Sequence, residues 1–427
     1  MNQDRLFRSA MIVFTMLTGC TSSGGDGGGD DDEGGGGGSG FHAVELPDEQ
    51  SPNDVRAVYC TAPDKCIIAT RSNVGDPGAV FAVSDTTVGD KLLDGKYMGP
   101  VSSVSSVLGD LDFIGLEPTR NGVVAHITAS SVYAVASGDV TAKASWSFVN
   151  MGRESGDTLP LNAMAALQQG SDGKWLFINK QGGVYSASQP PSATTAWTIV
   201  WQPDATPSVP ADFEDQYAAD PTLCDADVTA GGLPEPSSMA YIAQDLSVIV
   251  TPAGGLNQSG SAKPGVCISI DRGAHFYNVA FTGVPEDVSS PGPVGVTCAD
   301  KDTCWAYNGL IAQDGTAYIY YTTNASAGKA STWSRAMLPT RVTTGSDTTL
   351  SGIFFAPDKL HGWTVGNLDH HALLLRTTDG GRTWQDVSDS VQGVNDDDLY
   401  NGFALDNDHI WLAGRFGTLL ATRTAQQ

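Results

Sequence analysis

The densest histidine group in this sequence is Asp369-His370-His371. Imidazole nitrogens and carboxylate oxygens are common metal ligands, but a metal site needs further ligands at regular spacing, and the sequence offers none here. The run Asp396-Asp397-Asp398 could bind a divalent cation weakly, although most acidic runs are solvated loops. We therefore expect no resident metal or other cofactor, and we interpret residues 369–371 as a polar turn between two strands.

The distribution of charge indicates a binding surface. The formal net charge is −25, from 23 basic and 48 acidic residues, which argues against nucleic acid as a partner. Residues 202–236 contain neither Lys nor Arg. Together with neighbouring loops they should attract basic surfaces or divalent cations; the alternative is that these loops only increase solubility. The candidate binding face contains Asp212, Glu214, Asp215, Asp396, Asp397 and Asp398.

The cysteines are expected to be oxidised. Cys60 and Cys66, like Cys298 and Cys304, flank a short polar segment between two apolar stretches, as in a hairpin whose strands lie within disulfide reach. Zinc binding is the competing interpretation, but no histidine lies near either pair at a suitable spacing. Elimination then leaves Cys224 to pair with Cys267.

The first 40 residues indicate export and a lipid anchor. Residues 1–19 combine a basic start with a short apolar segment, and Leu17-Thr18-Gly19-Cys20 fits the bacterial lipobox. Cleavage before Cys20 would expose this thiol for acylation, whereas the alternative is a simple secreted protein. Thr21 favours the outer membrane or the cell surface. Residues 20–40 are rich in Gly and Asp and should form a flexible tether, so the lipid would be the only membrane contact.

One short segment identifies the repeating element of the rest of the chain. Thr377-x-Asp379-x-Gly381-x-Thr383-Trp384 matches the Asp-box pattern. The aspartate can accept hydrogen bonds from turn amides, and glycine can adopt positive φ without a Cβ clash. The tryptophan can fill the wedge between neighbouring sheets. An Asp box is therefore a structural hairpin, without a role in chemistry.

Degenerate copies of this box predict a β-propeller. One copy keeps Ser269, Asp271, Gly273 and Phe276. The aromatic landmarks of successive copies are separated by 51, 79, 57 and 51 residues and are Trp146, Trp197, Phe276, Trp333 and Trp384. Blades of about 40–50 residues match this period, and residues 202–236 explain the long gap as an insertion. We predict an all-β fold over residues 41–427 with seven four-stranded antiparallel blades. A strand at residues 41–46 would complete the last blade and close the ring.

Two segments carry a resemblance to a known family. The segment from His361 to Trp384 and the segment from Ile410 to Leu420 resemble the photosystem II assembly and stability factor-like group of BNR/Asp-box propellers. The resemblance is specific over about residues 350–422. It implies a seven-bladed, non-enzymatic protein that binds other proteins, without implying a photosynthetic partner.

Asp boxes also occur in sialidases, so an enzyme is the alternative. A sialidase needs an arginine cluster, a Tyr–Glu nucleophile pair and an acidic catalytic group, and no arginine here lies in the Arg-Ile-Pro context typical of those enzymes. No spacing singles out a carboxylate pair for another glycosidase. We expect an exported, lipid-anchored, monomeric scaffold that binds an envelope protein or glycan and has no catalytic residues. The alternative is a sialidase-like or other propeller glycoside hydrolase or lyase.

Overall fold

The structure is a computed structural model, and its described residues all lie in the compact unit Ser39–Gln427. They are residues 40–47, 53–72, 77–84, 86–95, 113–120, 122–127, 132–150, 153–154, 164–179, 183–192, 194–201, 240–253, 265–283, 295–308, 317–344, 348–392 and 397–422. The predicted signal peptide, Cys20 and most of the tether lie outside these residues. The lipid anchor therefore stays a prediction.

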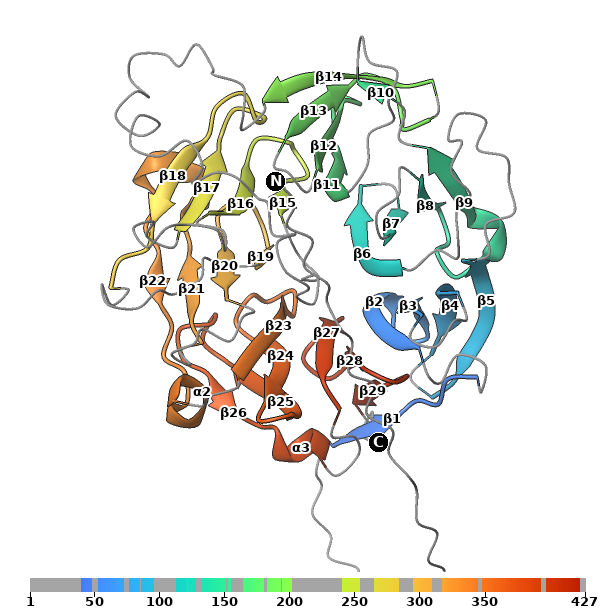
Figure 1. The fold of residues 1–427 in the computed structure, drawn as a ribbon, viewed down its shortest axis with the longest axis vertical. Coiled ribbons are helices and arrows are strands. Elements are labelled where there is room, and N and C mark those ends of the chain that lie inside the picture. The colour runs from blue at the N-terminus through green and yellow to red at the C-terminus, as the bar shows by residue number, and fades with distance from the viewer. Residues whose placement is uncertain are drawn as a thin grey trace, which may run out of the picture. The chain divides into compact units, whose positions relative to one another are not determined.

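The described strands form seven sheets arranged as blades around a ring (Figure 1). Blade 1 contains β2 (Asp54–Ala62), β3 (Lys65–Arg71), β4 (Ala79–Val83) and β5 (Val88–Asp94). Blade 2 contains β6 (Phe113–Thr119), β7 (Gly122–Ile127), β8 (Val132–Ser137) and β9 (Trp146–Asn150). Blade 3 contains β11 (Met164–Gln169), β12 (Trp175–Asn179), β13 (Val184–Ala187) and β14 (Ala196–Trp201), with β10 (Arg153–Glu154) parallel to β14.

The remaining blades repeat this pattern. Blade 4 contains β15 (Tyr241–Ile242), β16 (Ile249–Ala253), β17 (Gly265–Ser269) and β18 (Tyr277–Ala280). Blade 5 contains β19 (Gly295–Cys298), β20 (Cys304–Tyr307), β21 (Ile319–Thr322) and β22 (Ser334–Arg335). Blade 6 contains β23 (Thr348–Phe355), β24 (Gly362–Leu368), β25 (His371–Thr377) and β26 (Gln385–Asp386). Blade 7 contains β27 (Leu399–Ala404), β28 (Ile410–Gly414), β29 (Leu419–Thr422) and β1 (Phe41–Ala43).

Blade 7 closes the ring as predicted. Strand β1 pairs antiparallel with β29, with Phe41 opposite Thr422. This strand is shorter than the six residues predicted, but the Val44 amide still donates to the Leu419 carbonyl at 2.8 Å. Val44 and Leu46 are both buried, so the chain keeps packing on the ring after the strand ends.

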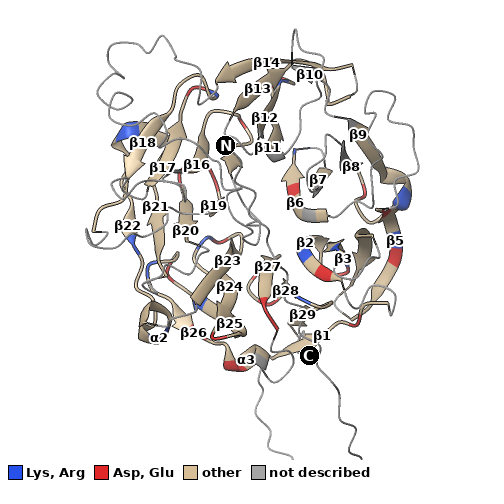
Figure 2. Ribbon diagram, viewed as in Figure 1, with Lys and Arg blue, Asp and Glu red and all other residues tan. Residues whose placement is uncertain are grey.

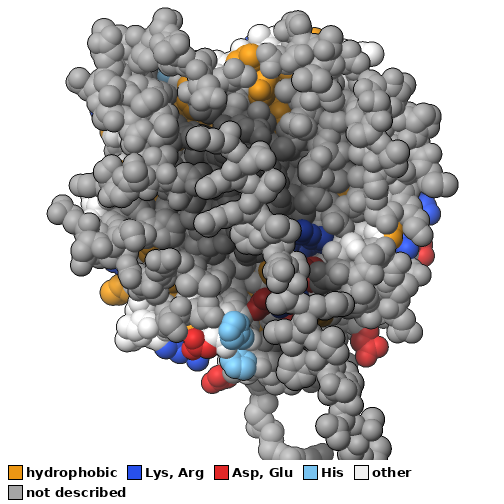
Figure 3. Space-filling model, viewed as in Figure 1, with side chains coloured by type: hydrophobic (Ala, Val, Ile, Leu, Met, Phe, Trp, Pro, Cys, Tyr) orange, Lys and Arg blue, Asp and Glu red, His pale blue; other side chains and the backbone are white. Residues whose placement is uncertain are grey.

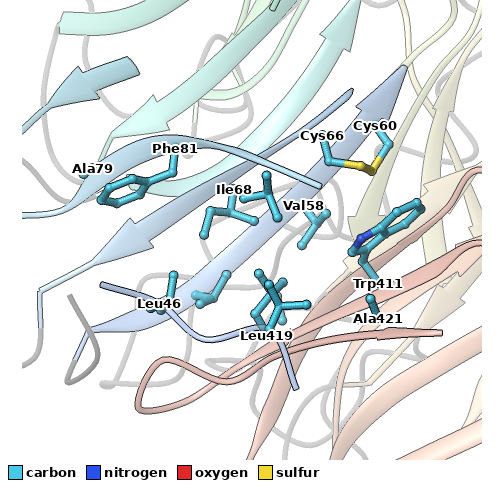
Figure 4. Packing of buried hydrophobic residues seen from close by; sticks show 14 residues of the cluster. Leu46, Val58, Cys60, Cys66, Ile68, Ala79, Phe81, Trp411, Leu419 and Ala421 are labelled. Carbon is cyan, nitrogen blue, oxygen red and sulfur yellow. A yellow bond between two sulfur atoms is a disulfide. The ribbon is translucent and has the colours of Figure 1, made fainter. Parts of the chain in front are cut away.

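The core lies between the blades. Among the described residues, buried side chains form seven clusters, and each cluster joins two neighbouring blades. At the seam where the ring closes, Leu46 and Trp411 of blade 7 pack with Val58, Ile68 and other residues of blade 1 (Figure 4). Every residue of strands such as β17 and β28 is buried, so both faces of these sheets contribute to this burial. The ring therefore gains stability at every interface.

Two predicted disulfides are confirmed. Cys60 and Cys66 lie opposite each other on β2 and β3, and Cys298 and Cys304 do so on β19 and β20. In both pairs the Cα atoms are 4.0 Å apart. Cys267 is also disulfide-bonded. Its predicted partner Cys224 lies outside the described residues, so that pairing stays a prediction.

Helices are few and short in the part of the chain that the structure describes. They are η1 (Lys143–Ser145), η3 (Ala325–Ala330), α2 (Thr340–Thr344) and α3 (Asp389–Gln392). Within that part, no helix has the length and apolar content needed to cross a bilayer.

Candidate functional site

The Asp box at residues 377–384 is a turn held by one carboxylate. Asp379 Oδ1 accepts hydrogen bonds from the amides of Arg382 and Thr383 at 3.0 and 2.9 Å. Its Oδ2 accepts from the Thr383 hydroxyl at 2.6 Å. The Thr377 hydroxyl donates to Oδ1 at 2.8 Å and accepts from the Gly381 amide at 3.0 Å. Burial alone raises the pKa of Asp379, but these hydrogen bonds outweigh it and lower the pKa.

The degenerate Asp box in blade 4 has the same hydrogen-bond geometry as the box at residues 377–384. The Ser269 hydroxyl donates to Asp271 Oδ1 and accepts from the Gly273 amide, both at 2.8 Å. His275 replaces the threonine, and its amide donates to Asp271 Oδ1 at 2.9 Å. Both boxes lie between the third and fourth strands of their blades. Each carboxylate accepts hydrogen bonds from its own turn, which agrees with a structural role.

The box glycines also join neighbouring blades. Gly381 has φ of +82°, and a Cβ there would lie 2.4 Å from the indole nitrogen of Trp305 in blade 5. That indole donates to the Gly380 carbonyl at 3.0 Å. Gly273 has φ of +84°, and its Cβ would lie 2.7 Å from Val184 in blade 3. Each box therefore packs on the blade before it, which explains why glycine is needed there.

A second set of turn aspartates was missed by the sequence analysis. Its members in blades 4 to 7 lie between the first and second strands and are Asp245, Asp300, Asp358 and Asp406; Asp172 accepts an equivalent hydrogen bond in blade 3. Each accepts hydrogen bonds from amides two or three residues further on. A single aspartate in a turn has no longer motif to reveal it, so spacing alone could not identify the set.

Three of these aspartates also contact the blade that follows. Lys301 of blade 5 lies 4.0 Å from Asp245 of blade 4. Lys359 of blade 6 forms an ion pair with Asp300 of blade 5. The Asn407 amide group of blade 7 donates to Asp358 of blade 6 at 3.1 Å. Polar contacts between successive blades thus follow this rim from blade 4 to blade 7.

A pocket of about 580 Å³ opens inside the ring beside these turns. Its walls come from the ends of β6 and β11 and from the turns after β15 and β19, so four successive blades contribute. Leu116, Pro118, Tyr241 and Val296 provide apolar surface. Pockets of this volume are typical of ligand sites. This pocket is therefore the candidate functional site.

The pocket contains three carboxylates and one ammonium group. Glu117 of β6 accepts a hydrogen bond from the Leu167 amide at 3.1 Å, and Figure 2 shows an acidic segment on β6. Asp245 and Asp300 hold their own turns and also contact Lys301 and Lys359, respectively. Burial raises the pKa of Tyr241, and the carboxylates of Asp300, Asp245 and Asp302 raise it further. The pocket therefore has a negative potential.

Hydrogen bonds govern the ionisation of two of these carboxylates. Burial alone raises the pKa of Asp300, but the Lys359 side chain and the amides of Thr303 and Asp302 lower it to about 2. The Ser247 side chain and amide lower the pKa of Asp245. Both groups are therefore carboxylates at neutral pH, which suits attraction of a cation rather than donation of a proton.

The acidic face predicted from the sequence is mostly untested. Asp212, Glu214, Asp215 and Asp396 lie outside the described residues, so their role stays a prediction. Asp397 and Asp398 are described and lie just before β27. Asp398 accepts a hydrogen bond from the Asn367 side chain and lies 3.7 Å from Arg415. It therefore links blades 6 and 7.

A buried ion pair lies at the start of β2. Arg56 lies 3.7 Å from Asp54, and their side chains are only 4% and 8% exposed. The guanidinium also lies over the Tyr400 ring of blade 7, 4.1 Å from its centroid. Figure 3 shows one face of the molecule, on which basic and acidic side chains lie next to each other near the middle. The contacts of Arg56 identify it as part of the seam between blades 7 and 1.

The Asp-His-His segment lies at the turn between two strands, as predicted, although its last residue, His371, already begins β25. Asp369 and His370 connect β24 to β25 and have φ of +52° and +67°. Within the described ranges, no three His, Cys, Asp or Glu side chains are grouped in a way that could hold a metal ion.

The fold and these turns define a seven-bladed propeller with Asp-box turns. Residues 325–427 match the family described as photosynthesis system II assembly factor YCF48. The resemblance predicted from the sequence is thereby confirmed in this segment, which includes blades 6 and 7. No curated protein sequence matches the chain.

Solved structures support the same fold. YCF48 bound to a D1 peptide is 14% identical, with a TM-score of 0.50 and coverage of 90% of this chain and 97% of that chain. YCF48 from Cyanidioschyzon merolae is 12% identical, with a TM-score of 0.55 and coverage of 91% and 100%. A GH74 xyloglucanase from Xanthomonas campestris is 10% identical, with a TM-score of 0.53, and the match covers 90% of this chain but 54% of the enzyme. At these identities the likeness shows the fold alone.

Proposed function

We propose that this protein is a non-catalytic propeller that binds a protein partner and acts as an assembly scaffold at a bacterial cell envelope. The observation that carries the proposal is the match of residues 325–427 to the YCF48 assembly-factor family. The solved YCF48 that resembles this chain binds a D1 peptide. Binding of a peptide segment of another protein is therefore the mode of action that we assign to this chain.

The electrostatics of the pocket support binding over glycoside hydrolysis. A glycosidase needs one carboxylic acid whose pKa is raised, so that it can protonate the leaving group. Two of the three pocket carboxylates, Asp245 and Asp300, have lowered pKa values instead. The third, Glu117, accepts a hydrogen bond from the Leu167 amide of the next blade. These three groups are therefore suited to maintaining a charged surface.

Capture from envelope membranes tests this function. The full chain with Cys20→Ser, exported without lipid, would serve as bait for detergent-solubilised membranes of the source organism. We expect one protein partner to bind saturably, and the same preparation to release no reducing ends from xyloglucan, sialosides or other glycans. Turnover of any of these glycans would replace the scaffold with the glycosidase alternative. Failure to retain any protein partner would also refute the proposal.

The location is a separate part of the proposal. The lipobox ending at Cys20 would place a lipid at the start of the mature chain, followed by a tether of Gly and Asp residues. Replacing Cys20 by Ser should move the protein from the outer-membrane fraction to the soluble fraction, whereas Cys267→Ser should leave it in the membrane. Metabolic labelling with a palmitate analogue checks the lipid directly. Continued membrane retention of the Cys20→Ser protein would contradict the anchor.

A further inference from the structure

The pocket is surrounded by the open edges of four strands. Strands β6, β11, β15 and β19 are each the end strand of their sheet, and Figure 1 places them around the middle of the ring. An end strand presents backbone N–H and C=O groups that no neighbouring strand uses. An extended peptide can pair with such groups, and its side chains then enter adjacent pockets.

Side chains of neighbouring blades already bind some of these edge groups. The Leu167 amide of β11 donates to Glu117 of blade 2 at 3.1 Å, and the Arg120 amide that follows β6 donates to Gln168 of blade 3 at 3.2 Å. Backbone groups at these edges therefore do form hydrogen bonds with side chains of the adjacent blade. On β19, the Thr297 hydroxyl is buried and has no hydrogen-bond partner among the described residues. It is a group that a ligand could satisfy.

The charge around the pocket is negative. Glu117, Asp245 and Asp300 line it together with Lys301. Lys359 contacts Asp300 from the next blade, and Lys301 lies 4.0 Å from Asp245 with its side chain 49% exposed. Two lysines thus stand against three carboxylates, so the charges of these described residues sum to a negative value. A cationic ligand would complement this site.

We propose that this pocket binds an extended peptide segment that carries an arginine or lysine side chain. The peptide backbone pairs with the open edges of β15 and β19, and its cationic side chain lies between Glu117 and Asp245. Apolar neighbours on the peptide contact Leu116, Pro118 and Tyr241. This assignment rests on the proposed function and specifies which partner segment the propeller recognises. The chain's own residues 22–40 are acidic and lack Lys and Arg, so they do not supply the cationic side chain that this pocket would bind.

Three capped hexapeptides of alternating Thr and Val provide the probe. They differ in one central residue, which is Arg, Ala or Glu, and their binding to the full-length Cys20→Ser protein is measured by fluorescence anisotropy. The Arg peptide should bind about tenfold more tightly than the Glu peptide at low salt, because like charges repel at the same position. Asp245→Asn keeps the oxygen that holds the turn but removes the charge, and it should weaken binding of the Arg peptide about fivefold.

Two further variants make the test independent of misfolding. Asp406 holds the equivalent turn in blade 7, away from the pocket, so Asp406→Asn should leave peptide binding unchanged. Lys301→Ala removes the cation that competes inside the pocket and should tighten binding of the Arg peptide by about threefold to fivefold. Misfolding would not produce such a gain.

The proposal is overturned if the Arg peptide does not bind at millimolar concentration, or if the Glu peptide binds equally well. Equal effects of Asp245→Asn and Asp406→Asn, or no gain from Lys301→Ala, would also overturn it. Capture of a protein partner from membranes despite these results would show that the protein is a scaffold that binds elsewhere. Failure of that capture would instead refute the proposed function itself.

Discussion

At the scale of single residues, the Asp-box glycine Gly381 must adopt a positive φ and must also leave room for a neighbouring side chain. Substitutions can separate these two requirements. Gly381 has positive φ and lies against the Trp305 indole of the preceding blade. Gly138, between β8 and β9, has φ of +83°, but a Cβ there would meet no atom within 4 Å. The two glycines therefore share the backbone conformation, but only Gly381 has a neighbouring side chain close to where a Cβ would lie.

We predict that Gly381→Ala costs more stability than Gly138→Ala. The positive φ alone should cost about 1–2 kcal/mol at each position, and the contact with Trp305 should add about 1–3 kcal/mol at Gly381. Urea unfolding of both variants, followed by tryptophan fluorescence, measures the difference. Equal losses would show that the indole contact is unimportant.

Residue patterns identified the boxes but not the pocket. Thr377, Asp379 and Gly381 lie within five residues, and their hydrogen bonds are local, so their spacing alone predicts the turn. The pocket brings Glu117 and Asp300 together from blades 2 and 5, and neither lies in a motif. Only the folded ring places both of them at one pocket. The negative charge was predicted for residues 202–236 and neighbouring loops, whereas the pocket lies beside the turns that follow β15 and β19.

At the scale of elements, the turns between first and second strands make the ring sensitive to acid. Folding lowers the pKa of Asp300 from 3.8 to about 2, because Lys359 and two turn amides bind the ionised carboxylate. A carboxyl group with a lowered pKa stabilises the folded state fully above its unfolded pKa. This stabilisation is lost as the pH falls from about 4 towards 2.

We predict that the effect of Asp300→Asn on stability depends on pH. The variant should be less stable than the wild type at pH 6, and the difference should shrink as the pH approaches 2. Thermal unfolding between pH 6 and pH 2 measures it. In the Lys359→Ala background the same substitution should show a weaker pH dependence, since the ion pair is absent. A difference that stays constant with pH would contradict the role of the ionised carboxylate.

At the scale of the whole molecule, a short strand from the start of the domain closes the ring. Phe41 is buried between blades 6 and 7, and β1 covers the edge of β29. Without this strand blade 7 would have three strands and an open edge, which favours aggregation. The sequence predicted this closure because blade 7 lacks a fourth strand of its own.

We predict that Phe41→Ala destabilises the protein by about 3 kcal/mol, as expected for a buried Phe. Glu45 is exposed in the same segment, and Glu45→Ala should change stability by no more than about 0.5 kcal/mol. Differential scanning calorimetry and light scattering measure the loss of stability and the onset of aggregation. A Phe41→Ala protein that unfolds like the wild type would show that β1 is dispensable.

Binding of a protein partner at the pocket is the central claim, and site-specific photo-cross-linking in cells of the source organism tests it most directly. A photoreactive residue replaces Gln244, which lies at the pocket, or Asp369, which lies in the turn between β24 and β25 at the other end of the strands. Both side chains are exposed. We expect a discrete protein adduct from position 244 and none from position 369. An adduct from position 369 alone, or none from either position, would contradict the account.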